Sequence, residues 1–209
     1  MKKIAVVGYK GKMGQPIFLS LSKKYNVVGI GRDDKLEEIA GLDLVVDVAS
    51  HESSVVSAEY CLKNRIPIII GSTGQTDEEN VRIEEISRSI MVIRKSNFSQ
   101  GIQAVIDVMG CILKLNPQKV EIIEKHHIKK KDSPSGTALL LKDHIERLYC
   151  GLIDIQSIRE GDEMGEHVIK FIFDDEEISI KHKVLSRMAF VRGLVKDVEN
   201  IFKEIDKKV

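Results

Sequence analysis

The chain has 209 residues, of which 43% are hydrophobic and 31% are charged, a balance typical of a folded globular protein. Its 32 basic and 32 acidic residues cancel to a formal net charge of zero, so the overall charge favours neither nucleic acid nor an anionic membrane as a partner. Three widely spaced cysteines without a C-x-x-C pair argue against a disulfide framework and against a zinc site. Because no apolar run approaches the roughly 20 residues of a membrane span, and no signal segment precedes the first strand-like run, we expect a cytoplasmic protein.

The first half of the sequence alternates short apolar, β-branched runs with segments of helical periodicity. The apolar runs predict strands over Ile4–Val7, Val27–Ile30, Leu44–Val48, Pro67–Ile70 and Ile90–Ile93. The segments between them predict helices over Met13–Lys24, Ser53–Asn64 and Asp77–Arg88. The connection from Gly31 to Leu42 has room for about one helical turn. This alternation predicts an α/β fold with a Rossmann-like, doubly wound parallel sheet whose ligand lies at the carboxyl ends of its strands.

The pattern changes after the segment that ends at Ser99. The remaining predicted elements are a helix over Gly101–Leu115, a strand over Lys119–Glu124, a helix over Thr137–Leu148, strands over Glu166–Phe173 and Glu177–Val184, and a helix over Arg187–Lys207. They predict a second, α+β domain with a mixed sheet. We therefore expect residues 1–98 and 187–209 to form a dinucleotide-binding domain, and residues 99–186 to form a substrate-binding and oligomerisation domain.

The segment from Glu124 to Thr137 combines two histidines, a run of three lysines and a Ser-Gly-Thr turn at the start of a predicted helix. Lysine offers a point positive charge, histidine exchanges a proton near neutral pH, and a helix start offers backbone N–H groups to an anion. This composition predicts a site that binds a small substrate with carboxylates and delivers a proton to it. The alternatives are a merely solvated basic loop or a metal site. Metal is disfavoured, because His126 and His127 point to opposite faces of an extended segment and no second pair has ligand spacing.

A glycine-rich loop follows the first predicted strand and leads into a helix. It reads Gly8-Tyr-Lys-Gly-Lys-Met-Gly14, and glycines at these positions allow a tight turn and let a pyrophosphate approach the N–H groups of a helix start. Lys10 stands where the commoner G-x-G-x-x-G pattern has its second glycine, so a tight turn without a ligand is the alternative.

Several motifs then occur in the order found in one enzyme family. They are the glycine loop Gly8–Gly14, Gly71-Ser-Thr-Gly74, Ser96-Asn-Phe-Ser99, Glu124-Lys-His-His127, Asp132-Ser-Pro-Ser-Gly-Thr-Ala138, the segment Arg159–His167, Lys181-His-Lys183 and Ser186–Phe190. In these motifs the chain resembles the 4-hydroxy-tetrahydrodipicolinate reductase family, formerly called the dihydrodipicolinate reductase family. The resemblance covers nearly the whole chain. It implies reduction of a cyclic dicarboxylate by NADPH or NADH in the diaminopimelate route to lysine, by a homotetramer that needs no metal.

The resemblance also implies roles for individual residues. His126 would be the acid/base residue and Lys130 the proton donor, while His127, Ser135, Gly136 and Thr137 would hold the substrate. Contacts with the cofactor are implied for Gly8, Tyr9, Lys10, Gly11, Lys12, Met13, Gly71, Ser72, Thr73, Ser96, Asn97, Phe98 and Ser99.

Cofactor preference rests on two residues at the end of the second predicted strand. Arg32 suits the 2′-phosphate of NADPH, whereas Asp33 suits the free 2′-hydroxyl of NADH, so we expect dual use with a lean towards NADPH. The chain is also shorter than many family members near Gly31–Ala40 and near Cys150–Ser157. Two rival functions keep the same fold, namely another nicotinamide-dependent reductase acting on an amino acid or its semialdehyde, and a dinucleotide-binding sensor without catalysis.

Overall fold

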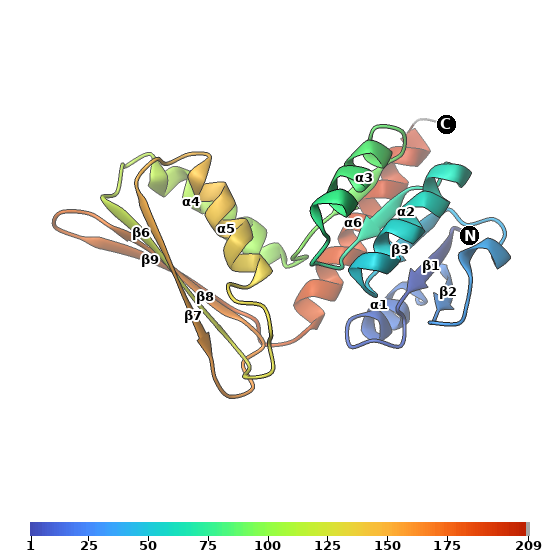
Figure 1. The fold of residues 1–209 in the computed structure, drawn as a ribbon, viewed down its shortest axis with the longest axis horizontal. Coiled ribbons are helices and arrows are strands. Elements are labelled where there is room, and N and C mark those ends of the chain that lie inside the picture. Colours follow the sequence, from blue (N-terminus) through green and yellow to red (C-terminus); the bar gives the residue numbers. More distant parts are fainter. Residues whose placement is uncertain (208–209) are drawn as a thin grey trace. The chain divides into compact units, whose positions relative to one another are not determined.

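The structure, a computed structural model, describes residues 1–207, so the last two residues of the predicted 187–209 segment lie outside the described residues. The chain folds into two compact units (Figure 1). Unit 1 comprises Met1–Phe98 together with the chain from Val191 onward, and unit 2 comprises Ser99–Phe190. The division falls inside the final helix, a few residues beyond the boundary expected from the sequence.

Unit 1 is built on a parallel sheet of five strands in the order β2-β1-β3-β4-β5. The strands are β1 (Lys3–Val7), β2 (Asn26–Ile30), β3 (Leu44–Asp47), β4 (Ile68–Ile70) and β5 (Val92–Arg94). Side chains of the central strands, such as Ile4, Leu44 and Ile69, are completely buried, which is why these strands read as unbroken apolar runs. The predicted doubly wound parallel sheet is confirmed.

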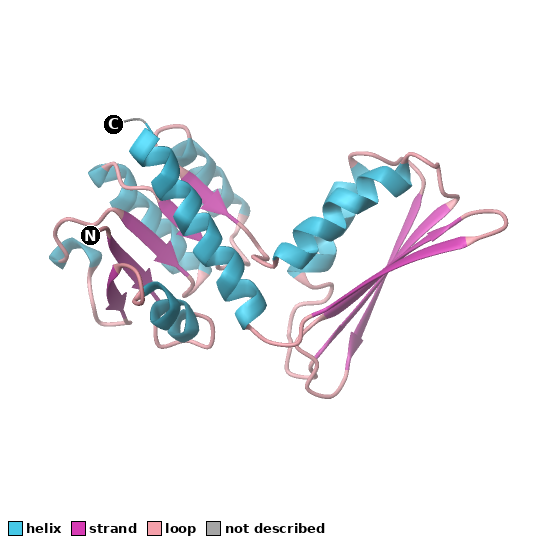
Figure 2. Cartoon of the chain, turned by 180° about the vertical axis from the view of Figure 1, so that it is seen from behind, coloured by secondary structure: helices cyan, strands magenta, loops and turns pink. Residues whose placement is uncertain are grey.

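Helices cover both faces of this sheet. Helices α2 (His51–Asn64) and α3 (Asp77–Ser87) lie on one face, and α1 (Gly14–Leu21) and α6 (Met188–Lys207) lie on the other (Figures 1 and 2). The Ser50 side chain caps α2 by accepting from the Ser53 N–H, and Thr76 and Glu79 form a capping box on α3. The short connection after β2 contains one 3₁₀ turn, η1 (Leu36–Glu38), as its length predicts.

Helix α6 belongs to unit 1 along most of its length. Its buried residues, Val191, Leu194, Val198, Ile201 and Phe202, recur every three or four positions and form one apolar stripe. Phe202 packs on Tyr25 with ring centroids 5.4 Å apart, and the Asp197 carboxylate pairs with Lys95 Nζ at 2.7 Å. The last helix therefore completes the core of the parallel-sheet unit.

Unit 2 is built on a mixed sheet of four strands in the order β7-β6-β8-β9. The strands are β6 (Lys119–His126), β7 (Leu152–Arg159), β8 (Glu166–Ile172) and β9 (Glu177–Lys183), and only the β6–β7 pair is parallel. Helices α4 (Gln100–Leu113) and α5 (Gly136–Glu146) lie along one face of the sheet, as Figure 2 shows. Among residues 1–207, no helix has both the length and the apolar character to cross a lipid bilayer.

Strand β7 is an element that the sequence pattern does not predict. The sequence indicates only a shortened segment near Cys150–Ser157, whereas in the structure Leu152–Arg159 forms an edge strand paired with β6. Half-buried Ile153 and Ile155 alternate with exposed Asp154 and Gln156. An edge strand packs against a neighbour on one side only, so its apolar signal is weaker than that of the central strands.

Two helical glycines give a matched test of the packing of these helices. A Cβ at Gly193 of α6 would lie 1.6 Å from the Phe98 carbonyl oxygen, whereas a Cβ at Gly110 of α4 would meet only Leu148 Cδ1 at 3.8 Å. We expect Gly193→Ala to lower the free energy of unfolding by about 3 kcal/mol, because the helix must move away from the Phe98 backbone. Gly110→Ala should raise it by up to about 1 kcal/mol, since alanine favours helix. Urea unfolding followed by circular dichroism measures both, and equal effects would contradict the packing described.

Candidate active site

The glycine loop between β1 and α1 is shaped by contacts that exclude side chains. Gly8 has a φ of +80° and lies against Ala49, and a Cβ at Gly14 would lie 2.0 Å from the Gly8 carbonyl oxygen. The Gly11 N–H donates to that same oxygen at 2.9 Å, closing the turn. Met13, at the N-cap of α1, makes no side-chain cap hydrogen bond. The loop thus presents backbone and a helix start at the carboxyl end of β1, which suits a pyrophosphate.

A groove of about 630 Å³ opens beside this loop, next to the ends of β2 and β3. Its lining includes Gly8, Lys10, Gly11, Arg32 and Lys35, which bring three positive side chains to one cavity. This combination suits the phosphorylated adenosine half of a dinucleotide.

Two acidic residues, Asp34 and Glu37, line the groove, and the predicted Asp33 is not among the lining residues. The Asp34 carboxylate accepts from the Gly31 N–H at 2.7 Å, which fixes the turn after β2. A role for Asp33 towards a ribose hydroxyl therefore stays a prediction, and Asp34 and Glu37 are the carboxylates that line the groove.

The remaining predicted cofactor residues follow the carboxyl ends of the next strands. Gly71, Ser72 and Thr73 come directly after β4, and Ser96, Asn97 and Phe98 come after β5. A Cβ at Gly71 would lie 2.8 Å from the Phe98 ring, so these two segments are in contact. Ser99 begins unit 2, where it caps α4 by accepting from the Ile102 N–H. The parallel sheet thus brings together predicted residues separated by as many as 90 positions in sequence.

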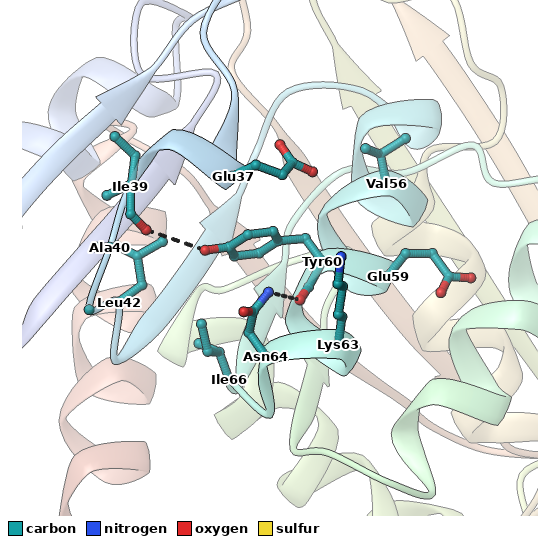
Figure 3. A pocket seen from close by; sticks show the side chains of 11 residues that line it. Glu37, Ile39, Ala40, Leu42, Val56, Glu59, Tyr60, Lys63, Asn64 and Ile66 are labelled. Atoms are coloured by element: carbon teal, nitrogen blue, oxygen red, sulfur yellow. Dashed lines mark hydrogen bonds between the residues drawn. The ribbon is translucent and has the colours of Figure 1, made fainter.

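A second hollow of unit 1 has a different character (Figure 3). It has a volume of about 790 Å³ and lies between the segment after η1 and helix α2. Tyr60 lies across it, with its hydroxyl donating to the Ile39 carbonyl at 3.4 Å (Figure 3). None of the residues predicted to bind the cofactor or substrate lines this hollow.

In unit 2, the predicted catalytic segment starts at the last residue of β6. His126 is buried at the strand end, and its Nδ1 is hydrogen-bonded to a carboxylate oxygen, Oε2, of Glu124. The two residues are two positions apart on one strand, so their side chains lie on the same face of the sheet. His127 follows the strand, and its backbone N–H donates to the Glu163 carbonyl oxygen at 2.8 Å.

Glu124 is a completely buried carboxylate with several donors around it. Besides His126, it accepts at Oε1 from Arg159 Nη2 at 2.6 Å and from the Ser135 backbone N–H at 3.2 Å. Burial alone would raise the pKa of Glu124, but hydrogen bonds from Arg159, Ser157 and His126 outweigh it and lower the pKa to about 2. The carboxylate is therefore ionised at neutral pH.

The histidines near this carboxylate are held in the neutral form. Burial lowers the pKa of His126 although Glu124 opposes the shift, and burial together with the neighbouring His126 lowers the pKa of His167 to about 3. The two rings meet edge to face with centroids 5.3 Å apart. His167 Nε2 lies 3.3 Å from the Ser135 hydroxyl, and His182 Nε2 lies 3.2 Å from the Ser99 hydroxyl. An uncharged row of imidazoles thus lines the sheet beside α4 and α5.

Lys130 differs from its two lysine neighbours. Its side chain is half-buried, and its Nζ lies 2.8 Å from an Asp132 carboxylate oxygen, whereas Lys129 and Lys131 are exposed. The Asp132 carboxylate also accepts from the backbone N–H of Gly136, at the start of α5. Burial tends to raise the pKa of Asp132, but Lys130 and the backbone donors outweigh it and lower the pKa. The Lys130 ammonium and the Gly136 N–H at the start of α5 therefore both interact with the Asp132 carboxylate.

The structure brings His126, Lys130, Ser135 and the α5 start into one neighbourhood of unit 2, as the sequence analysis expected, and their roles stay predictions. It adds Glu124, Arg159 and His167, to which the sequence analysis gave no role. The spacing of Glu124 and His126 was a usable signal, because residues two apart on a strand share a face.

Glu124, His126 and His167 also offer ligand atoms within 4.8 Å of one another, which is a spacing open to a metal ion. The Arg159 guanidinium already holds Glu124, and it would repel a second cation. We therefore assign this cluster to hydrogen bonding between protein groups.

Comparison with known proteins identifies the family of the chain. Residues 22–98 match the family model described as dihydrodipicolinate reductase, N-terminus, and residues 101–209 match the model described as dihydrodipicolinate reductase, C-terminus. The 4-hydroxy-tetrahydrodipicolinate reductase of Thermosipho africanus is 35% identical over 197 residues, which cover 93% of this chain and 88% of that protein. That of an Anaeromyxobacter species is 33% identical over 186 residues, covering 78% and 69%.

Solved structures agree on the fold. The dipicolinate-bound dihydrodipicolinate reductase from Paenisporosarcina sp. TG-14 aligns with a TM-score of 0.76 at 21% identity, covering 97% of this chain and 95% of that one. The aspartate dehydrogenase of Thermotoga maritima aligns with a TM-score of 0.60 at 15% identity, covering 96% and 97%. The reductase function and the fold class predicted from the sequence are confirmed by these comparisons. The chain belongs to the dihydrodipicolinate reductase family of nicotinamide-dependent oxidoreductases.

Proposed function

We propose that this chain reduces dihydrodipicolinate to tetrahydrodipicolinate with NADPH or NADH, in the diaminopimelate route to lysine. The observation that carries the proposal is the carboxylate of Asp132, held by the Lys130 ammonium at 2.8 Å and by the Gly136 N–H. A site that binds a carboxylate of its own chain in this way suits a substrate with two carboxylates. Membership of the family supports the same reaction.

Unit 1 is the proposed cofactor-binding unit. The glycine loop and the start of α1 would hold the pyrophosphate, and the groove with Lys10 and Arg32 would hold the adenosine half. The segments after β4 and β5 would flank the nicotinamide. When bound there, the cofactor supplies one hydride to the substrate ring.

Unit 2 is the proposed substrate-binding unit, and it supplies the proton. Hydride addition to a conjugated C=C next to an imine leaves an electron pair that must be protonated, so one hydride and one proton are added in total. The Lys130 ammonium would donate that proton and become an amine, and His126 would serve as the acid/base residue. His127, Ser135, Gly136 and Thr137 would hold the carboxylates at the start of α5, after the substrate displaces Asp132.

We also propose a homotetramer in the cytoplasm. Helices α4 and α5 cover one face of the unit 2 sheet (Figure 2). The other face includes the half-buried apolar side chains of Ile123 and Val168. The same face carries ion pairs such as Lys119–Glu121 and Lys181–Glu166, so pairing between subunits there would combine apolar and charged contacts. Analytical ultracentrifugation of the full chain measures the number of subunits directly.

A coupled assay tests the function. NADPH or NADH should be oxidised only when the condensation product of pyruvate and aspartate semialdehyde is present, and pyridine-2,6-dicarboxylate should compete with that product. Turnover of an amino acid or a semialdehyde alone would favour a different reductase. Cofactor binding without any turnover would favour a sensor.

Lys130→Ala should abolish most turnover and leave the Kd of the cofactor nearly unchanged, because the proposed proton donor acts on the substrate. We expect kcat to fall by about 10²–10⁴-fold, the range of a positioned general acid. Stopped-flow or steady-state oxidation of NADPH measures kcat, and fluorescence titration measures cofactor affinity.

Lys129→Ala and Lys131→Ala are the matched controls, since both side chains are exposed in the same loop. A generic positive patch would make the three variants similarly mild. Three indistinguishable variants would remove Lys130 from the proposed role even if the reaction itself were confirmed.

Arg32→Ala should raise the KM for NADPH about tenfold more than the KM for NADH. The guanidinium lines the groove, and loss of one charge-assisted contact with a 2′-phosphate costs about 1.5 kcal/mol. Kinetics with each cofactor at fixed substrate measure the ratio. Equal changes in the KM for both cofactors would show that Arg32 does not contact the 2′-phosphate.

A further inference from the structure

The hydrogen bonds of Glu124 are divided unequally between its two carboxylate oxygens. Oε2 faces the His126 ring nitrogen Nδ1, and the Ser157 hydroxyl is a further partner of the carboxylate. Oε1 faces two fixed donors, Arg159 Nη2 at 2.6 Å and the Ser135 backbone N–H at 3.2 Å. Neither of these donors can act as an acceptor, so Oε1 remains turned towards them.

This division determines which ring nitrogen of His126 carries the proton. A neutral imidazole has one N–H donor and one acceptor nitrogen, and a carboxylate oxygen can only accept. We infer that Glu124 is a positioning residue for His126, which holds the imidazole proton at Nδ1 and leaves the lone pair of Nε2 available for proton exchange with the substrate. Arg159 and the Ser135 N–H support this arrangement by fixing the carboxylate.

The far side of the ring is kept clear by a glycine. A Cβ at Gly165 would lie 3.0 Å from His126 Nε2, and Gly165 has a φ of +149°, a conformation that other residues rarely adopt. A side chain at this position would press on the nitrogen that the inference leaves free. The Glu124 carboxylate on one side of the imidazole and Gly165 on the other are therefore compatible with the same ring orientation.

The charged and titratable groups around His126 come from three strands and one loop. They are Glu124 on β6, Arg159 on β7, His167 on β8 and Lys130 in the loop after β6. Lys130 and Arg159 lower the pKa of His126 in addition to the larger effect of burial, while Glu124 raises it. The lowered pKa favours the neutral form of the His126 ring, which is the form that has two alternative tautomers.

Glu124→Gln tests the inference with little change of shape. The amide oxygen should occupy the Oε1 position, because the two groups there can only donate, whereas the Ser157 hydroxyl can either donate or accept. The amide NH₂ then faces Nδ1, which must accept, so the ring proton moves to Nε2. The nitrogen needed for proton exchange would then carry a proton it cannot easily lose.

The experiment combines ¹⁵N NMR of histidine-labelled full-length protein with kinetics. In the wild type, His126 should show the Nδ1–H tautomer, and in Glu124→Gln it should show the Nε2–H tautomer. We expect kcat to fall by about 10²–10⁴-fold in the variant, with substrate KM changed less than threefold and the Kd of NADPH unchanged. Glu121→Gln is the matched control on the same strand, where the carboxylate pairs with Lys119 and does not approach His126, and it should change neither readout.

Arg159→Gln provides a second test in case Glu124→Gln does not fold. Removal of the guanidinium should leave the Nδ1–H tautomer in place, because Glu124 remains, and it should raise the NMR titration midpoint of His126. An unchanged or lowered midpoint would contradict the role given to Arg159. An Nε2–H tautomer in the wild type, or full kcat in a folded Glu124→Gln variant, would overturn the inference.

The catalytic part of the inference rests on the proposed function, and the two can fail separately. The tautomer is measured without substrate. An inactive wild type with the Nδ1–H tautomer would refute the proposed reaction, whereas an active wild type with the Nε2–H tautomer would refute the role of Glu124.

Discussion

Unit 2 depends on one buried charge. The carboxylate of Glu124 is fully removed from water, and a buried charge is tolerated only where hydrogen bonds and an opposite charge replace its hydration. Its donors come from its own strand, from Arg159 on the neighbouring β7 and from the Ser135 N–H at the start of α5. The same carboxylate therefore fixes the edge strand, the helix start and the imidazole of His126 relative to one another. Loss of any one donor would affect the others through this shared acceptor.

Unit 1 depends instead on glycines at positions where a side chain would not fit. Gly8, Gly14 and Gly193 each lie where a Cβ would meet neighbouring atoms at 2.9 Å or less. The first two let the chain turn tightly between β1 and α1, and the third lets α6 approach the Phe98 backbone. Backbone N–H groups at the carboxyl end of the sheet are thus presented to a ligand without intervening side chains. Unit 2 therefore offers charged side chains to a ligand, whereas the glycine loop of unit 1 offers backbone N–H groups.

Much of the fold could be predicted from the sequence because its signals are local. Unbroken apolar runs indicated the five parallel strands, and the glycine spacing after the first of them indicated a tight turn there. The edge strand β7 was missed because a strand packed on one side has a weak apolar pattern. The contact of Arg159 with Glu124 spans 35 positions and depends on the pairing of β7 with β6, which no local pattern reveals. Likewise, whether Asp33 or Asp34 lines the groove depends on the turn after β2. That turn is closed by a hydrogen bond from the Gly31 N–H to Asp34, which a sequence pattern does not define.

The contact of Asp132 with Lys130 and the Gly136 N–H changes how ligand affinity should be understood. At the proposed site, an incoming carboxylate would not meet a bare cation, because it would replace a carboxylate that is already present. Binding is then an exchange of one anion for another, and its free energy reflects the difference between two similar contacts. The second carboxylate of a substrate bound at the proposed site, together with its ring, would then supply most of the net affinity. Small monocarboxylates would accordingly be poor competitors, and the loop would discriminate in favour of dicarboxylates without any additional contact.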